Sequence, residues 1–256
     1  MKHRVTLLLL ALSLLLVGHP RRDVNASAGP TLAERLGFKP TDKILIINGD
    51  DVGVSHAANA ATIDALENGL MTSGTIMVPC PWFPEIATYA RAHPAADFGL
   101  HLTHTAEWKG LKWGPVASKS EVAGLVDPQG YLWPDVASVY KSATPEQAYI
   151  EARAQIRKAL DAGIDVTHLD SHMGALQYNE AYFQVYRRLA KEFALPLRMG
   201  SQETLAPLGG GHQRGQLDSD GTIYPDNLIY GGRKHLTSIS IGQVWKPAAS
   251  ASVPAK

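Results

Sequence analysis

Two histidines and an aspartate alternate along residues 167–174, which read T-H-L-D-S-H-M-G. The segment follows a β-prone run, so we expect it at the carboxyl end of a strand, where successive side chains point to opposite faces. His168, Asp170 and His172 would then share one face. Such a set can hold a divalent metal ion or do acid–base work, because a neutral imidazole donates a lone pair and a nearby carboxylate orients it and raises its basicity.

Acids and histidines also gather at the ends of two earlier predicted strands. Residues 48–53 read N-G-D-D-V-G, and residues 99–104 read G-L-H-L-T-H. In an α/β protein with parallel strands, the working residues collect beyond the carboxyl ends of the strands. We therefore expect the three segments to meet in one metal site.

The segments that must position these residues alternate between strand and helix patterns. Strands are predicted at 43–48, at 74–78, at 97–103 and in the run that leads into 167–174. Helices are predicted from Ser55 to Gly69, at 84–91, from Thr144 to Gly163 and from Asn179 to Phe193. The apolar run at 43–48 is typical of a strand buried on both faces. The alternation predicts right-handed β-α-β units in a parallel sheet, either open or closed into a barrel.

Composition and charge narrow the class of protein. The chain has 256 residues, 45% of them hydrophobic and 19% charged, as expected for one large globular domain or two small ones. The formal net charge is zero, and no long basic run occurs, so we expect no binding to nucleic acid. The single cysteine, Cys80, excludes an internal disulfide and a multi-cysteine metal site. We interpret it as a packed residue and not a nucleophile.

Residues 1–28 are predicted to be a signal peptide. Basic residues precede an apolar run at 5–17, which is too short to span a bilayer comfortably, and residues 26–28 read A-S-A, a cleavage pattern. We expect export to the periplasm or the cell exterior, with no stable membrane span after cleavage. An uncleaved anchor is the alternative.

In this order and at these separations, the motifs N-G-D-D-V-G, G-L-H-L-T and H-L-D-S-H resemble those of the YdjC-like carbohydrate deacetylases. The resemblance covers residues 43–229. It implies an α/β fold, a parallel-stranded (β/α) barrel of the polysaccharide deacetylase type, and removal of acetyl groups from N-acetylated sugars or oligosaccharides such as chitooligosaccharides. By position, Asp51, His101 and His172 match the metal ligands, and Asp50 matches the general base.

The chemistry of amide hydrolysis agrees with these roles. Of two adjacent aspartates, one carboxylate can be neutralised by a metal ion while the other stays free to take a proton from water. The resemblance implies Mg²⁺, whereas two nitrogens and one oxygen also fit Zn²⁺. Asp170 and His168 are expected behind the ligands, with His168 alternatively acting as a proton relay.

The insertion at 106–143 is rich in aromatic residues. Trp108, Trp113 and Trp133 are predicted to stack on sugar rings, since an aromatic face combines apolar contact area with a defined geometry. The alternative is that these rings form the loop's own small core. His104 is expected on the face opposite His101, in a structural role.

The sequence departs from the family near its end. Family members commonly carry further histidines after the position of His172, and a late His-Pro motif that is absent here after Ile229. We count about five strand–helix units, fewer than the eight of a complete barrel. We therefore expect a barrel that is incomplete at the C-terminus, with the deacetylase-like domain at 31–232 and a disordered tail at 233–256.

Two functions follow as expectations. The first is a metal-dependent carbohydrate deacetylase, and the alternative is a catalytically impaired carbohydrate-binding protein on a truncated scaffold. A metal-dependent phosphoesterase is disfavoured, because no phosphate-binding Gly-rich loop or arginine cluster accompanies the ligands. The sequence leaves the oligomeric state open.

Overall fold

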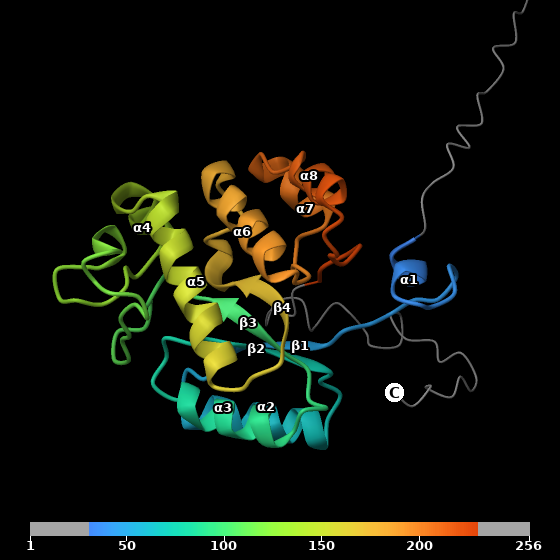
Figure 1. Cartoon of the computed structure of the whole chain (residues 1–256), viewed down its shortest axis with the longest axis horizontal. Helices are drawn as coiled ribbons and strands as arrows, with labels where there is room; N and C mark the ends of the chain where they lie inside the picture. Colours follow the sequence, from blue (N-terminus) through green and yellow to red (C-terminus); the bar gives the residue numbers. More distant parts are fainter. Residues whose placement is uncertain (1–30, 230–256) are drawn as a thin grey trace, which may run out of the picture. The chain divides into compact units, whose positions relative to one another are not determined.

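The computed structural model describes residues 31–229 (Figure 1). The predicted signal peptide at 1–28 and the predicted tail at 233–256 lie outside the described residues. The chain divides into two compact units, Met1–Asp42 and Lys43–Lys256. The described part of the first unit contains one short helix, α1 (Leu32–Arg35), which begins with a capping box.

The second unit is built on a parallel four-stranded sheet, in which the strands lie side by side in chain order. The strands are β1 (Asn48–Val52), β2 (Ser73–Ile76), β3 (Phe98–Leu102) and β4 (Val166–Ser171). All three pairings are parallel. The predicted α/β class with a parallel sheet is confirmed, and the carboxyl ends of all four strands lie at one edge of the sheet.

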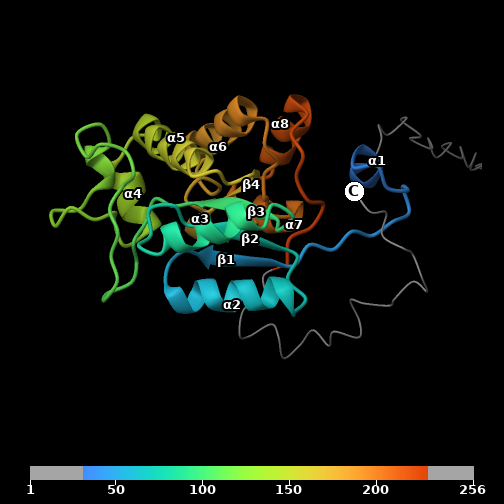
Figure 2. The same cartoon turned by 60° about the horizontal axis from the view of Figure 1, so that its bottom comes forward.

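Four helices flank the sheet. They are α2 (His56–Glu67), α3 (Phe83–Ala92), α5 (Pro145–Asp161) and α6 (Glu180–Phe193). In Figure 1, α2 and α3 lie below the sheet, α6 lies above it, and α5 runs diagonally past the strands. Figure 2 shows α2 beneath β1, with α5 and α6 on the side of β4.

Shorter elements complete the described unit. The α-helices are α4 (Val136–Ser142), α7 (Gln202–Leu205) and α8 (Gln213–Asp220). Three turns of 3₁₀-helix span Ala123–Leu125, His172–Gly174 and Ala206–Leu208. The sequence analysis predicted none of these as helices, because each is too short to show a helical period.

The long helices begin where the sequence supplies caps. Thr144 and Gln147 form a capping box at the start of α5, with Pro145 at its first position. Asn179 caps α6 through its side-chain oxygen. These caps satisfy backbone N–H groups that the first turn of a helix leaves without partners, and they fix where α5 and α6 meet the strands beside them.

The chain continues in extended conformation beside β4. Leu197 forms a parallel bridge with Leu169, and the backbone N–H of Leu197 donates to the carbonyl of Ile223. The N–H of Arg198 donates to the carbonyl of Leu169 at 2.8 Å. This pairing brings Arg198 next to the strand that carries Asp170.

The first strand begins later than predicted. Of the apolar run at 43–48, only Asn48 belongs to β1, and Ile44, Leu45, Ile46 and Ile47 are between 39% and 63% exposed. The prediction of a strand buried on both faces over this run is therefore wrong. The ladder begins at Asn48, which pairs with Ser73, the first residue of β2.

The core lies between the sheet and its helices. Strand residues such as Ile76, Leu100 and Leu169 are fully buried, together with Ile156 of α5 and Phe183 of α6. Burying a side chain of this size contributes about 1.5–3 kcal/mol.

Two further expectations concern Cys80 and membrane-spanning segments. Cys80 is 3% exposed, so its prediction as a packed residue is confirmed, and burial raises the pKa of its thiol. Within residues 31–229, every helix is too short or too polar to cross a bilayer.

Candidate metal centre

Three side chains converge at the carboxyl ends of β1, β3 and β4. Oδ1 of Asp51 lies 3.4 Å from Nε2 of His101 and 3.2 Å from Nδ1 of His172. The three ligand atoms all lie within 4.8 Å of one another. Both imidazoles are buried, whereas the side chain of Asp51 is 41% exposed. The structure thus brings together the three residues that the sequence singled out as metal ligands, with one side open to solvent.

A bulge in β1 turns two adjacent carboxylates toward the same histidine. The register of β1 against β2 shifts between Gly49 and Val52, and Asp51 has a left-handed backbone with φ of 61°. Regular alternation would send Asp50 and Asp51 to opposite faces, but a bulge interrupts it. Both carboxylates therefore lie close to His101. Left-handed backbone is uncommon outside glycine, and aspartate is among the residues that tolerate it best.

His172 occupies the 3₁₀ turn that follows β4 directly. The next residue, Met173, has a left-handed backbone with φ of 52°. The N–H of Leu176 donates to Oγ of Ser171 at 2.9 Å, which closes the turn behind the histidine. The abrupt end of the strand at this turn points the His172 ring at Asp51.

The charges at the cluster suit a divalent cation. Burial raises the pKa of the Asp51 carboxyl, but the imidazoles of His101 and His172 outweigh burial and hold it well below its usual value. Burial lowers the pKa of His101, whereas Asp170 and Asp51 outweigh burial and raise it to about 10. In the same way, Asp51 and Glu107 raise the pKa of His172 against burial. The carboxylates that favour protons on these ring nitrogens would favour a cation at the same atoms.

The geometry of Asp51 also fits a cation. Its Oδ1 atom is buried, and no hydrogen bond of good geometry reaches it from the described residues. Two ring nitrogens nevertheless face it at 3.2 and 3.4 Å. Two nitrogens and one oxygen around a common point are a donor set that zinc and similar divalent ions accept. Asp51, His101 and His172 therefore fit a divalent metal ion.

Each imidazole has a second carboxylate on its far side. Nδ1 of His101 lies 2.7 Å from Oδ2 of Asp170, and Nε2 of His172 lies 3.1 Å from Oε2 of Glu107. Burial raises the pKa of Asp170, but His101 and Arg198 outweigh burial and lower it to about 2. The buried carboxylate is therefore charged at neutral pH and holds the ring in place.

Asp50 has a different set of partners from Asp51. Its Oδ1 accepts from Nη1 of Arg198 at 2.5 Å and from Nδ2 of Asn48 at 2.8 Å. Its side chain is 34% exposed. The two adjacent carboxylates thus differ: Asp51 faces two imidazoles, and Asp50 faces a guanidinium and solvent.

A family of known proteins matches most of this chain. The model of the YdjC-like protein family matches residues 44–239. This chain belongs to the YdjC-like family. The matched region contains Asp50, Asp51, His101 and His172. The resemblance inferred from three short motifs is therefore confirmed over most of the chain.

Relatives of this YdjC-like chain include proteins named carbohydrate deacetylase. One from Thermus thermophilus is 36% identical over 175 residues, covering 68% of this chain and 60% of the relative. One from Thermoanaerobacter pseudethanolicus is 31% identical over 156 residues, covering 61% of this chain and 60% of the relative. The matches thus span about 60% of the length of these curated relatives.

A solved structure has the same fold. It is a crystal structure from Enterococcus faecalis V583, provisionally named a cellobiose-phosphate cleavage protein, with a TM-score of 0.64 and 30% sequence identity. The match covers 74% of this chain and 69% of the solved one. The parallel sheet with flanking helices is therefore the fold shared with a solved relative.

In this YdjC-like chain, His168 lies apart from the ligands. Its ring packs over Gly99 on β3, where an added Cβ would lie 2.5 Å from the ring atoms. Its Nδ1 lies 2.9 Å from Oγ1 of Thr167 and 4.0 Å from Oδ1 of Asp97. Burial lowers the pKa of His168 despite the nearby acids. The ring fills the space beside Gly99, where any other residue would place its side chain.

The three tryptophans of the insertion differ in exposure. Trp108 is 44% exposed, whereas Trp113 is 3% exposed and donates from Nε1 to the carbonyl of Thr105. Trp133 is half-buried and donates from Nε1 to the carbonyl of Gly124. Trp113 and Trp133 therefore hold the loop together, and Trp108 is the ring that solvent reaches.

Sequence reasoning missed Glu107 and Arg198. Glu107 lies in the aromatic insertion and Arg198 lies beyond α6, so neither stands beside a histidine or aspartate in the sequence. The pairing of Leu169 with Leu197 brings Arg198 to the cluster. The rule that site residues follow strands could have found it, had the extended segment after α6 been recognised as a strand position.

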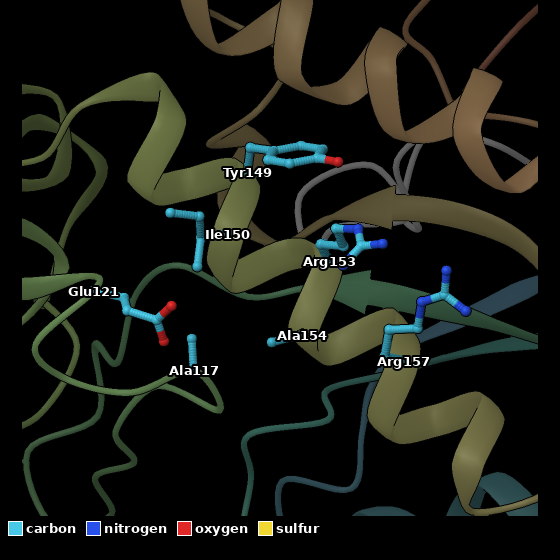
Figure 3. Close-up of a pocket in the computed structure, with 7 residues that line it drawn as sticks. All are labelled: Ala117, Glu121, Tyr149, Ile150, Arg153, Ala154 and Arg157. Carbon is cyan, nitrogen blue, oxygen red and sulfur yellow. The ribbon is translucent and has the colours of Figure 1, made fainter.

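A separate groove of about 440 Å³ lies along α5 (Figure 3). Its seven lining residues are Ala117, Glu121, Tyr149, Ile150, Arg153, Ala154 and Arg157. None of them belongs to the metal cluster. The groove is therefore separate from the candidate metal centre.

Proposed function

We propose that this chain acts as a metal-dependent hydrolase that removes acetyl groups from N-acetylated carbohydrates, with chitooligosaccharides as the substrate class. The observation that carries the proposal is the different surroundings of Asp50 and Asp51. One carboxylate faces two imidazoles and the other faces Arg198 and solvent. The names of the relatives support the same reaction.

Asp51, His101 and His172 would hold the cation. When bound, a divalent ion would polarise the acetyl carbonyl and make water a stronger acid. The resemblance supports Mg²⁺, and the donor set supports Zn²⁺ equally well.

Asp50 would act as the general base. Its carboxylate would take a proton from the attacking water while the water oxygen bonds to the acetyl carbon. The carbon–nitrogen bond would then break, the leaving nitrogen would take the proton that Asp50 had accepted, and the acetate and the free amine would be released. Arg198 and Asn48 fix Oδ1 of Asp50 at 2.5 and 2.8 Å. Holding the base in one place before the reaction is worth much of its catalytic effect.

Trp108 would contact the sugar. It follows Glu107 in the chain, and Glu107 bonds to His172. Because Trp108 is exposed and adjoins a residue that contacts the candidate metal centre, its ring can offer a face to a pyranose without unfolding the loop.

The basic start and apolar run within residues 1–28 further support our proposal that the protein is exported.

Acetate release from N-acetylglucosamine oligomers tests the function. The purified chain would be assayed with Mg²⁺, with Zn²⁺ and with a chelator, beside Asp50→Asn and Asp51→Asn. We expect metal-dependent release by the wild type and none by Asp50→Asn, which should still bind the metal ion. Asp51→Asn should lose both acetate release and metal binding. Release that survives chelation, or a fully active Asp50→Asn, would contradict the mechanism. Oligomer binding without any release would favour the carbohydrate-binding alternative.

A further inference from the structure

Glu107 makes one directed contact with the metal cluster. Nε2 of His172 lies 3.1 Å from Oε2 of Glu107, within hydrogen-bonding geometry. The other ring nitrogen, Nδ1, lies 3.2 Å from Oδ1 of Asp51. The ring is 5% exposed and the Glu107 side chain 26%. His172 is thus clamped between the carboxylate of the candidate ligand Asp51 and a carboxylate from the insertion.

The other histidine is also flanked by two carboxylates. Nε2 of His101 faces Asp51 at 3.4 Å, and its Nδ1 lies 2.7 Å from Asp170. The two histidines use opposite ring nitrogens toward Asp51, yet each has an acid at the remaining nitrogen. The repeated pattern indicates a requirement of the cluster, because one chance contact would not be matched at the second ring.

We infer that Glu107 is a positioning residue for His172 and sets the affinity of the site for its metal ion. The inference rests on the proposed function for the presence of the ion. A nitrogen that binds a cation must be free of its proton, so the ring proton must sit on the other nitrogen. A carboxylate at that nitrogen stabilises the required tautomer, fixes the plane of the ring and increases the basicity of the ligating atom.

Glu107 acts through the histidine and not as a ligand. Its Oε2 contacts Nε2, on the side of the ring away from the nitrogen that faces Asp51. Among the described residues, the groups of acids and histidines close enough to share an ion include Asp51 and His172 but not Glu107.

The insertion is built to hold Glu107 still. The residue before it, Ala106, is fully buried, and its N–H donates to the carbonyl of Trp133 at 2.8 Å. Further along, the buried carboxylate of Glu151 on α5 accepts from the N–H groups of Val116 and Ala117, each at 2.9 Å. A loop tied to a helix in this way can keep a side chain in register with a ring that follows β4.

Zinc titration by calorimetry on the full chain tests the inference. The wild type would be compared with Glu107→Ala and Glu107→Gln, and with Glu121→Ala as a matched control. Glu121 is an exposed acid of the same insertion that lines the α5 groove (Figure 3). Glu107→Ala should weaken zinc binding roughly 10–100-fold. Glu107→Gln should lose less, because its amide oxygen still accepts from Nε2. Glu121→Ala should bind like the wild type.

Each contrary result has a separate meaning. Equal zinc binding by Glu107→Ala and the wild type would overturn the inference alone. So would an equal loss in Glu121→Ala, which would make the effect one of general charge. An equally large loss in Glu107→Gln and Glu107→Ala would also overturn the hydrogen-bonding role. Tight zinc binding by a wild type that releases no acetate would overturn only the catalytic proposal, and a wild type that binds neither Zn²⁺ nor Mg²⁺ would overturn both.

Discussion

Arg198 and Asp50 are 148 positions apart in the chain, and their Nη1 and Oδ1 atoms meet at 2.5 Å. The same nitrogen lies 2.6 Å from Oδ2 of Asp170, which in turn holds His101. One guanidinium, only 13% exposed, therefore joins the candidate base on β1 to the carboxylate on β4 that orients a candidate ligand. The Arg198 guanidinium therefore couples the position of the candidate base, Asp50, to that of the candidate ligand, His101.

Replacing this guanidinium should reduce both turnover and stability. Arg198→Met keeps the length of the side chain but leaves Asp50 without its anchor, and we expect acetate release to fall about 100-fold, as a small displacement of a catalytic group can produce. Asp170 would also lose a charge partner while buried, at a cost of up to about 3 kcal/mol. Urea unfolding of the metal-free chain measures the second effect. Asp50→Asn is the control, because it leaves the pair of Arg198 and Asp170 in place, so it should unfold like the wild type.

Gly99→Ala should destabilise the fold through His168. The added methyl carbon would lie 2.5 Å from the ring, which is fixed beside Thr167. Overpacking of this kind costs typically about 1–3 kcal/mol. The double variant Gly99→Ala with His168→Ala should recover part of the loss, since the methyl group then has space. Urea midpoints of the four proteins give the coupling, and purely additive effects would show that the two residues do not compete for this space.

His104 should make the fold sensitive to mild acid. It is fully buried, with Nε2 bonded to the carbonyl of Ala148 at 3.0 Å, and burial lowers its pKa from 6.5 to about 4. Between these two values the unfolded chain binds the proton and the folded chain does not, so stability falls as the pH falls from about 6.5 to 4. The loss is on the order of 3 kcal/mol. His104→Gln keeps a donor without titrating, and its free energy of unfolding should depend less on pH in this window. Parallel curves for both proteins would exclude the effect.

Two tryptophans of the insertion should respond differently to truncation. Trp113→Ala removes a buried ring and its bond to Thr105, which should cost about 3–5 kcal/mol of stability. Trp108→Ala removes a ring that is 44% exposed, so stability should barely change while KM for the oligomer rises. Thermal unfolding and steady-state kinetics separate the two. An unchanged KM in Trp108→Ala would remove this ring from the sugar site.

Features that depend on residues close together in the sequence could be predicted, whereas features that depend on contacts between distant segments could not. The helix α5 was predicted well, because its capping box lies within four residues, 144–147. Of the candidate ligands, Asp51 and His101 lie near the carboxyl ends of β1 and β3 and His172 follows β4, so a rule about strand ends was sufficient to group them. Arg198 follows a single bridge pair, Leu169 with Leu197, that leaves no periodic pattern in the sequence.

Two errors or omissions had a different cause. The run at 43–48 has the composition of a buried strand, but burial depends on what packs against it, and the register of β1 with β2 begins only at Asn48 and Ser73. Likewise, Glu107 was one acid in an aromatic loop, and its importance depends on where Trp133 and Glu151 hold that loop. The composition of a segment does not reveal which segments pack against it, and that packing decides both the exposure of the run at 43–48 and the contact of Glu107 with His172.

The exposed run at Ile44–Ile47 has a consequence for how the protein behaves at high concentration. It leads into β1, which is an outer strand of the sheet among the described residues. An outer strand with apolar side chains is a template for pairing with another chain. With a formal net charge of zero, the molecules have no long-range repulsion to keep them apart. This short segment should therefore favour self-association when the protein is concentrated.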